Sequence, residues 1–447
     1  MASSDTRPNV VVFFTDQQRW DTTGVHGNPM GLTPNFDRMA VEGTHCYHAF
    51  TNQPVCLPAR AVLQTGRYAS QVDCMSNARQ LPLDARTLAH HFNDAGYATG
   101  YIGKWHLAKD NPVPPERRGG YQYWLASNVL EWTSDAYRCE TYNGDGKLVR
   151  LPGYRVDGLA DAAIRYIDGH QRDPFFLFLS FLEPHFQNSR DDYPAPTGYE
   201  ERYLDPWTPP DLRALGGTSP QHLPGYYGMV KRLDEALGRV QDALKSLGLA
   251  ENTIVLFTTD HGNHFKTRNG EYKRSCHDGS VRIPMAFSGP GFDGGGRRRD
   301  LVSLVDVAPT LLDACGLDVP AEMMGRSLLS ERQHQPDDVF IQISEAQVAR
   351  AVRTRRWKYC VSAPTADTAG TTASADRYVE EALYDLLADP YELNNLIGLQ
   401  SHQPVAEVMR ARLLRRMAQA GEPAPAIDPA PTRPSGQKRV SEEETTM

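Results

Sequence analysis

The sequence lacks a hydrophobic run long enough to cross a membrane. Its longest apolar stretch, residues 175–182, is interrupted by a serine, whereas a membrane-spanning helix needs about 20 apolar residues. Residues 1–8 also lack the apolar core of a secretion signal. We therefore expect a cytoplasmic protein with no membrane partner, and a periplasmic location stays open if a leader has been removed.

An excess of positive charge is missing as well. The 447 residues include 47 Lys and Arg against 55 Asp and Glu, which gives a formal net charge of −8. Nucleic-acid-binding domains usually carry a basic face, so we expect no nucleic-acid partner.

Paired cysteines are also absent from the sequence. Its seven cysteines are an odd number, and no two of them form a Cys-x-x-Cys motif. This pattern fits neither a disulfide framework nor a zinc ribbon. It indicates reduced thiols, as is usual in a cytosol.

What is present is an alternation of buried strands and amphipathic helices. Apolar, β-branched or aromatic runs predict strands at residues 9–14, 97–102, 175–182, 253–258 and 282–287. Capping residues and helical periodicity predict helices at residues 34–42, 86–95, 156–168, 226–247 and 306–315. This order predicts an α/β fold with a doubly wound, mostly parallel sheet flanked by helices. Residues 110–154 and 187–218 show no clear period, and we expect irregular segments there.

The character of the chain changes near residue 336. Short alternating runs at residues 339–343, 349–353, 357–361 and 382–386 predict a small antiparallel sheet, packed with a helix at 404–419. From residue 421 the chain is rich in Pro, Ala and Glu. We therefore expect a catalytic domain at 1–335, a C-terminal α+β subdomain at 336–420 and a flexible tail at 421–447.

Polar residues follow four of the predicted strands directly. In open α/β sheets, ligands bind outside the carboxyl ends of the strands. One such cluster would be compatible with a simple turn, but four at the same edge of a sheet predict a shared site. The residues are Asp16 and Gln17, Lys104 and His106, His185, and Asp260 and His261.

A further candidate site lies at residues 55–67. Pro58 suits the first position of a helix and Gly66 the position after its end. Cys56 would then lie just before the helix N-terminus, where free N–H groups favour an anion. Arg60, one turn further along, reaches the same place. A buried apolar thiol is the ordinary alternative for a lone cysteine.

The string Cys-x-Pro-x-Arg at residues 56–60, with Leu-x-Thr-Gly-Arg at 63–67, resembles the signature of the sulfatase family. Segments 96–107, 258–262, 273–284 and 383–396 are similar to further stretches of that family, in the expected order. The resemblance implies an alkaline-phosphatase-like fold. It also implies that a maturation enzyme oxidises Cys56 to formylglycine.

The resemblance also implies roles for individual residues. One divalent metal would be held by Asp16, Gln17, Cys56, Asp260 and His261. Arg60, Lys104 and Lys273 would stabilise charge on the transferring group, His185 or Lys273 would protonate the leaving alcohol, and His106 would act on the covalent intermediate. Many sulfatases have two aspartates at positions 16–17 and Asp-Asn at 260–261, whereas this chain has Asp-Gln and Asp-His. Ca²⁺ is the metal implied; the imidazole makes Mn²⁺ more competitive, and Mg²⁺ also stays open.

Three functions stay open on the sequence. The first is hydrolysis of a small-molecule or saccharide sulfate ester. The second is hydrolysis of a phosphonate monoester or phosphodiester with the same groups, which stays open because the Asp-Gln and Asp-His pairs resemble both the phosphonate monoester hydrolase branch and some bacterial sulfatases. The third is a non-catalytic, metal-binding protein in which Cys56 stays a thiol. An oligomer is compatible with all three. Six aromatic residues could stack on a substrate ring or fill the core: Tyr121, Tyr123, Trp124, Trp132, Tyr137 and Tyr142.

Overall fold

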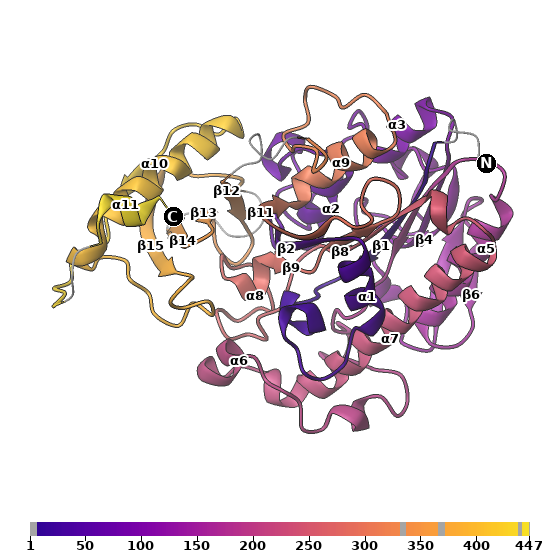
Figure 1. Ribbon diagram of the computed structural model, residues 1–447, viewed down its shortest axis with the longest axis horizontal. Helices are drawn as coiled ribbons and strands as arrows, with labels where there is room; N and C mark the ends of the chain where they lie inside the picture. The colour runs from indigo at the N-terminus through magenta and orange to yellow at the C-terminus, as the bar shows by residue number, and fades with distance from the viewer. Residues whose placement is uncertain (1–6, 331–336, 365–371, 437–439, 447) are drawn as a thin grey trace.

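A computed structural model describes residues 7–330, 337–364, 372–436 and 440–446. The chain forms a large mixed sheet covered by helices and a smaller sheet built by its C-terminal part, which lies to one side in yellow and orange (Figure 1). The expected α/β class is confirmed.

The large sheet has eleven strands in the order β11-β2-β10-β8-β1-β7-β3-β4-β5-β6, with β9 paired to β2. The strands are β1 (Asn9–Thr15), β2 (Thr44–Phe50), β3 (Ala98–Lys104), β4 (Tyr123–Ser127), β5 (Cys139–Asn143), β6 (Leu148–Leu151), β7 (Phe175–Ser180), β8 (Thr253–Thr259), β9 (Arg282–Ile283), β10 (Ala286–Ser288) and β11 (Gly296–Ser303).

The centre of this sheet is parallel. Strand β1 pairs with β7 and β8, and β3 pairs with β7 and β4, all in parallel. Every residue of β1, β7 and β8 is buried, as expected for strands covered on both faces. Because their direction is shared, the carboxyl ends of β1, β3, β7 and β8 meet at one edge of the sheet.

Helices cover both faces, as predicted. The face with Val10 and Val12 packs on α2, α3 and α9, and the face with Val11 and Phe13 packs on α1, α5 and α7 (Figure 1). This alternation follows from the two-residue period of a strand. The helices are α1 (Pro34–Glu42), α2 (Cys56–Thr65), α3 (Leu88–Asp94), α4 (Leu130–Thr133), α5 (Arg155–Gly169), α6 (Pro210–Leu215), α7 (Ser219–Ser246), α8 (Asp278–Val281), α9 (Val307–Ala314), α10 (Gln403–Gln419) and α11 (Glu442–Thr445).

The structure corrects three expectations for the large domain. Residues 110–154 are not irregular throughout, because β4, α4, β5 and β6 lie there and extend the sheet. Strand β2 was not predicted, since its alternation of Thr, His, Tyr and apolar residues gives a weak signal. The predicted fifth strand is two short ones, β9 and β10, separated by Pro284 and Met285, and both pair antiparallel.

The second sheet has the order β12-β13-β14-β15-β16. Its strands are β12 (Asp338–Ile343), β13 (Ala349–Thr354), β14 (Trp357–Ser362), β15 (Arg377–Asp385) and β16 (Ala426–Asp428). The first four pair antiparallel, as expected. Strand β16 lies in the segment expected to be a flexible tail, yet it pairs in parallel with β15. The expectation of a flexible tail is therefore wrong for residues 426–428, for Glu422, which is buried and pairs with Arg350, and for α11, where Glu444 O accepts from Arg356. The sequence did not reveal β16, because a strand of three residues has no distinctive composition.

Among the described residues, the helices are too short or too polar to cross a membrane.

Candidate active site

The four strand ends bring the predicted polar residues together. Lys104 is the last residue of β3, while Asp16 and Asp260 directly follow β1 and β8. His185 lies five residues beyond the end of β7. The parallel centre of the sheet therefore places groups that are up to 244 residues apart in sequence at one edge, with the side chains of Asp16 and Asp260 fully buried.

Cys56 is the first residue of α2, and Val55 is the N-cap. Pro58 is thus at the third position rather than the predicted first, which is also compatible with proline because the first N–H groups of a helix have no partner within it. Gly66 ends the helix with a φ of 65°, as predicted. The backbone N–H of Leu57 donates to Asn77 Oδ1 at 3.1 Å. This bond anchors the first turn of α2 beside the strand ends.

The thiol of Cys56 lies among charged groups. Its Sγ is 2.9 Å from Lys273 Nζ, 3.3 Å from His261 Nε2 and 3.7 Å from Asp16 Oδ1. Burial alone would raise the pKa of this thiol, but Lys104, Lys273 and His261, with a hydrogen bond from His106, lower it well below its usual range. An inert structural cysteine would lie among apolar side chains instead.

Asp16 is held by two cations. Lys104 Nζ lies 2.7 Å and Arg60 Nη2 2.9 Å from its Oδ2. Burial and Cys56 raise the pKa of Asp16, but Lys104, His185 and Arg60 outweigh them, so the pKa falls and the carboxylate stays ionised. Arg60 also approaches Asp260 at 3.4 Å.

The donors of Asp16, Cys56, Asp260 and His261 all lie within 4.8 Å of one another and are buried. Burial, followed by the charge of Asp16, raises the pKa of Asp260 to about 7. Arg60 offsets only part of the repulsion between the two buried carboxylates, because the pKa of Asp260 stays raised although Arg60 contacts both. The donor set therefore fits a divalent metal, which would relieve this repulsion.

Gln17 lies beside this cluster. It has a φ of 65°, and its backbone N–H donates to Asp260 Oδ1 at 3.0 Å. Its Nε2 donates to Tyr193 Oη at 3.3 Å, and its Oε1 accepts from Lys273 Nζ at 3.5 Å. The amide oxygen thus shares Lys273 Nζ as a neighbour with Cys56 Sγ.

The two predicted histidines flank Cys56. His185 Nε2 lies 3.1 Å from Lys273 Nζ, and burial together with Lys273 lowers the pKa of His185. His106 has a φ of 55°, and its backbone N–H donates to Asn128 O at 2.8 Å. All predicted site residues therefore lie in one buried cluster.

The sequence did not indicate two neighbours of this cluster. Glu131, from α4, lies 2.9 Å from Lys104 Nζ. Tyr193 binds Gln17 and also accepts a hydrogen bond from Asn263 Nδ2 at 2.9 Å. Both come from segments expected to be irregular, where no period or motif marks them. Of the aromatic candidates, Tyr121 and Trp124 are core residues, while Trp132 and Tyr137 are 65% and 54% exposed.

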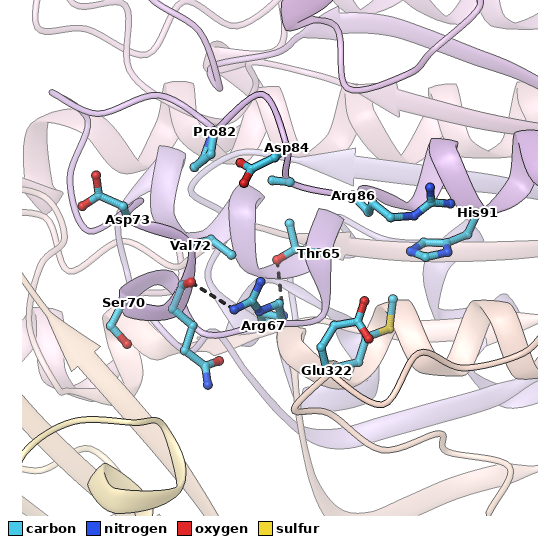
Figure 2. A pocket seen from close by; sticks show the side chains of 13 residues that line it. Thr65, Arg67, Ser70, Val72, Asp73, Pro82, Asp84, Arg86, His91 and Glu322 are labelled. Carbon is cyan, nitrogen blue, oxygen red and sulfur yellow. Dashed lines mark hydrogen bonds between the residues drawn. The ribbon is translucent and has the colours of Figure 1, made fainter.

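A separate hollow of about 520 Å³ lies at the other end of α2, around Arg67 (Figure 2). Its walls carry charges of both signs, from Arg67, Arg86, Asp73, Asp84 and Glu322. None of the predicted site residues lines it, so the hollow is distinct from the candidate active site.

Comparison with known proteins identifies the family of this chain. The family model described as Sulfatase matches residues 8–317, and the model described as N-sulphoglucosamine sulphohydrolase, C-terminal, matches residues 270–419. The chain belongs to the sulfatase family. Its named homologues are sulfatases, which supports a sulfuric ester hydrolase with an alkaline-phosphatase-like fold.

One curated relative is the ulvan-active sulfatase of Formosa agariphila, which is 30% identical over 93% of this chain and 82% of its own length. Among solved structures, a sulfatase candidate named YidJ from Bacteroides fragilis has a TM-score of 0.82 at 26% identity, covering 95% of this chain and 98% of its own.

Two further structures share the fold. One, solved with its substrate D-glucosamine-2-N,6-O-disulfate, has a TM-score of 0.77 at 22% identity, covering 93% of this chain and 98% of its own. The other is the phosphonate monoester hydrolase of Agrobacterium radiobacter, with a TM-score of 0.72 at 23% identity, covering 93% and 96%.

Proposed function

We propose that this sulfatase hydrolyses sulfate esters with a formylglycine that a maturation enzyme makes from Cys56. The observation that carries the proposal is the setting of the Cys56 thiol, which is buried at a helix N-terminus beside Lys273, His261 and Asp16. The hydrated aldehyde would offer two hydroxyl groups. One attacks the sulfur of the ester, and the other later gives up its proton.

The cations of the site would stabilise the charge that develops on the transferring group. Arg60, Lys104 and Lys273 are buried and fixed before the substrate arrives, and fixed donors of this kind usually supply the largest catalytic contribution. His185 or Lys273 would give a proton to the leaving alcohol. His106 would take the proton of the second hydroxyl.

The metal would be held by Asp16, Asp260, His261 and residue 56, with the amide oxygen of Gln17. Carboxylate and amide oxygens suit Ca²⁺ and also Mg²⁺, and the imidazole makes Mn²⁺ more competitive. A bound divalent ion supplies positive charge that acidifies a hydroxyl of the hydrated aldehyde.

For the substrate we propose a sulfated saccharide. The exposed rings of Trp132 and Tyr137 supply flat apolar faces on the segment that carries Glu131. A protein of the same fold was solved with a disulfated glucosamine as its substrate. A small-molecule sulfate ester is the alternative.

A second candidate function is hydrolysis of phosphonate monoesters. The pairs Asp16-Gln17 and Asp260-His261 support it, because they resemble the phosphonate monoester hydrolase branch as well as some bacterial sulfatases, and a phosphonate monoester hydrolase shares the fold.

Two measurements test the proposal. In active enzyme, the peptide with residue 56 should weigh roughly 18 Da less than its cysteine form, because two hydrogens and a sulfur are replaced by an oxygen. Parallel assays should then show faster hydrolysis of sulfated saccharides than of a phosphonate monoester. An active preparation with only unmodified Cys56 would exclude the mechanism, and a faster phosphonate reaction would favour the second function.

A further inference from the structure

Glu131 is a buried carboxylate at the active site that the proposed chemistry has not used. Its side chain is about 4% exposed, and its Oε1 lies 2.9 Å from Lys104 Nζ and 3.9 Å from His106 Nδ1. Burial raises the pKa of Glu131, but Lys104 and His106 outweigh this effect and lower it. The side chain of Glu131 is therefore a carboxylate anion in the folded protein.

Two polar atoms at this contact have no hydrogen-bond partner among the described residues. They are His106 Nδ1 and Glu131 Oε2, both buried. Since His106 forms its contact with Cys56 and Nδ1 is unpaired, Nε2 is the ring nitrogen left to face Cys56. The imidazole thus lies between a carboxylate on its Nδ1 side and residue 56 on its Nε2 side.

The backbone that carries Glu131 is fixed by a buried network. Gln187 Nε2 donates to the carbonyl oxygens of Glu131 and Ser134, at 2.8 and 2.9 Å. Arg155 donates to Gln187 Oε1 at 3.3 Å and pairs with Glu183 at 2.8 Å. A four-residue helix such as α4 would not hold its position without such support.

We propose that Glu131 is a positioning residue, which orients His106 so that its Nε2 serves as the base for the second chemical step. This arrangement of carboxylate, imidazole and reacting residue follows the logic of catalytic triads. The separation of 3.9 Å is longer than a hydrogen bond, and such contacts commonly shorten when substrate binds. The inference rests on the proposed function, because it needs the covalent sulfated intermediate at residue 56.

The step that Glu131 supports is the collapse of that intermediate. His106 Nε2 takes the proton of the free hydroxyl on the former aldehyde carbon. The electron pair of that O–H bond forms the carbonyl, and the bond between the carbon and the sulfate oxygen breaks, so that sulfate leaves with its electron pair. Water then adds to the aldehyde, and His106 returns its proton to solvent. Once the contact shortens to hydrogen-bond distance, Glu131 would accept the Nδ1–H and so hold the ring in place during this step.

The test uses Glu131→Gln, which keeps the size of the side chain and removes its charge. If Glu131 acts through His106, alcohol should be released in a burst of about one per site, followed by turnover slowed about 10- to 100-fold. The residue-56 peptide should carry a trapped sulfate, measured by mass after rapid quenching. If alcohol is released slowly from the first turnover and no adduct forms, the proposal is overturned. Glu131 would then act through Lys104 in the first chemical step. Unchanged kinetics would overturn it as well.

Two further variants serve as controls for this experiment. In the double variant with His106→Ala, Glu131→Gln should add no further loss, because both changes remove the same function; additive losses would overturn the proposal. Asp135→Asn serves as the matched control, since this exposed carboxylate on the same segment pairs only with Arg190 among the described side chains. It should leave the kinetics unchanged. If His106→Ala itself shows no adduct, the proposed mechanism fails, which is distinct from a failure of Glu131→Gln alone.

Discussion

Asp16 is the residue that links the groups of the site. Its carboxylate contacts Lys104 and Arg60 through one oxygen, and Cys56 and His261 lie 3.7 and 3.9 Å from the other. Substituting one of these residues changes the charge balance of the site rather than the packing of the core. The residue-scale predictions therefore concern catalysis and metal preference.

Asp260→Ala should remove the metal and lower activity about a thousand-fold, because a bound ion stabilises the charged transition state by several kcal/mol. The bulk of the hydrophobic core should stay folded. Elemental analysis and thermal unfolding measure the two effects. Full activity of the wild type after stripping with a chelator would contradict the site assignment.

Gln17→Asp should shift the metal preference toward Ca²⁺, because it adds a hard charged oxygen beside Asp260. The measurement is activity of stripped enzyme restored with Ca²⁺, Mn²⁺ or Mg²⁺ in turn. An unchanged order of the three metals would count against Gln17 as a ligand.

Lys273→Ala should lower kcat/KM about 100-fold with no burst, because Lys273 stabilises charge in the first step. Arg60→Ala should behave alike. Rapid-quench kinetics separates both from His106→Ala, which should release a burst of alcohol and then stall. Lys266→Ala is a matched control, since this lysine is partly exposed and pairs with Asp191. A burst in Lys273→Ala would move that residue to the second step.

At the scale of elements, the site depends on how closely β3 and β7 approach. Gly103 has a φ of +106°, and a Cβ there would lie 1.8 Å from the carbonyl oxygen of Ser180. Arg60 Nη1 then ties the two strand ends together, because it donates to Lys104 O at 2.9 Å and to Ser180 Oγ at 2.8 Å. The guanidinium of Arg60 thus fixes α2 to the ends of β3 and β7.

Gly103→Ala should destabilise the fold by about 3 kcal/mol or more, because it adds backbone strain and a steric overlap. Urea unfolding measures the change. Gly169→Ala is the control, since a Cβ at this exposed end of α5 meets nothing within 4 Å; it should stay within about 0.5 kcal/mol of wild type. Equal stability of the two variants would contradict the role given to Gly103.

At the scale of the whole molecule, the small sheet is joined to the catalytic domain by buried ion pairs. Lys358 Nζ, on β14, lies 2.5 Å from Asp278 of the large domain, and Arg353 lies 3.2 Å from the same carboxylate. Glu392, in the C-terminal part, lies 2.5 Å from Lys358 as well. Asp278 begins α8, five residues after Lys273. The C-terminal subdomain therefore supports the segment that brings Lys273 to Cys56.

Lys358→Met should cost about 3–5 kcal/mol, because it leaves buried carboxylates with too little positive charge. Activity should fall with stability, since the Lys273 segment loses its support. Thermal unfolding and kcat/KM measure the two. Arg377→Ala removes an exposed pair with Asp428 and should cost less than about 1 kcal/mol. A Lys358→Met variant as stable and active as wild type would show that the two parts function independently.

The sequence by itself determined the parallel sheet, and it predicted the polar residues that the structure brings together in one cluster. Continuous apolar runs specify buried parallel strands, and their direction alone brings Asp16, Lys104, His185 and Asp260 to one edge. The helix near Cys56 could also be predicted, because a few neighbouring residues determine where a helix starts. These features depend on contacts close in sequence or on strand direction, so a linear pattern records them.

Tertiary structure alone decided what surrounds those residues. Glu131 and Tyr193 reach the site from segments without a period, and β2, β5 and β6 exist because neighbouring strands and packing stabilise sequences with weak propensity of their own. The pairing of Lys358 with Asp278 joins residues 80 apart, and β16 lies 49 residues after β15 begins. Such contacts form when burial leaves a charged side chain or the backbone of an edge strand without another partner. The order of residues does not show which distant residue will become that partner.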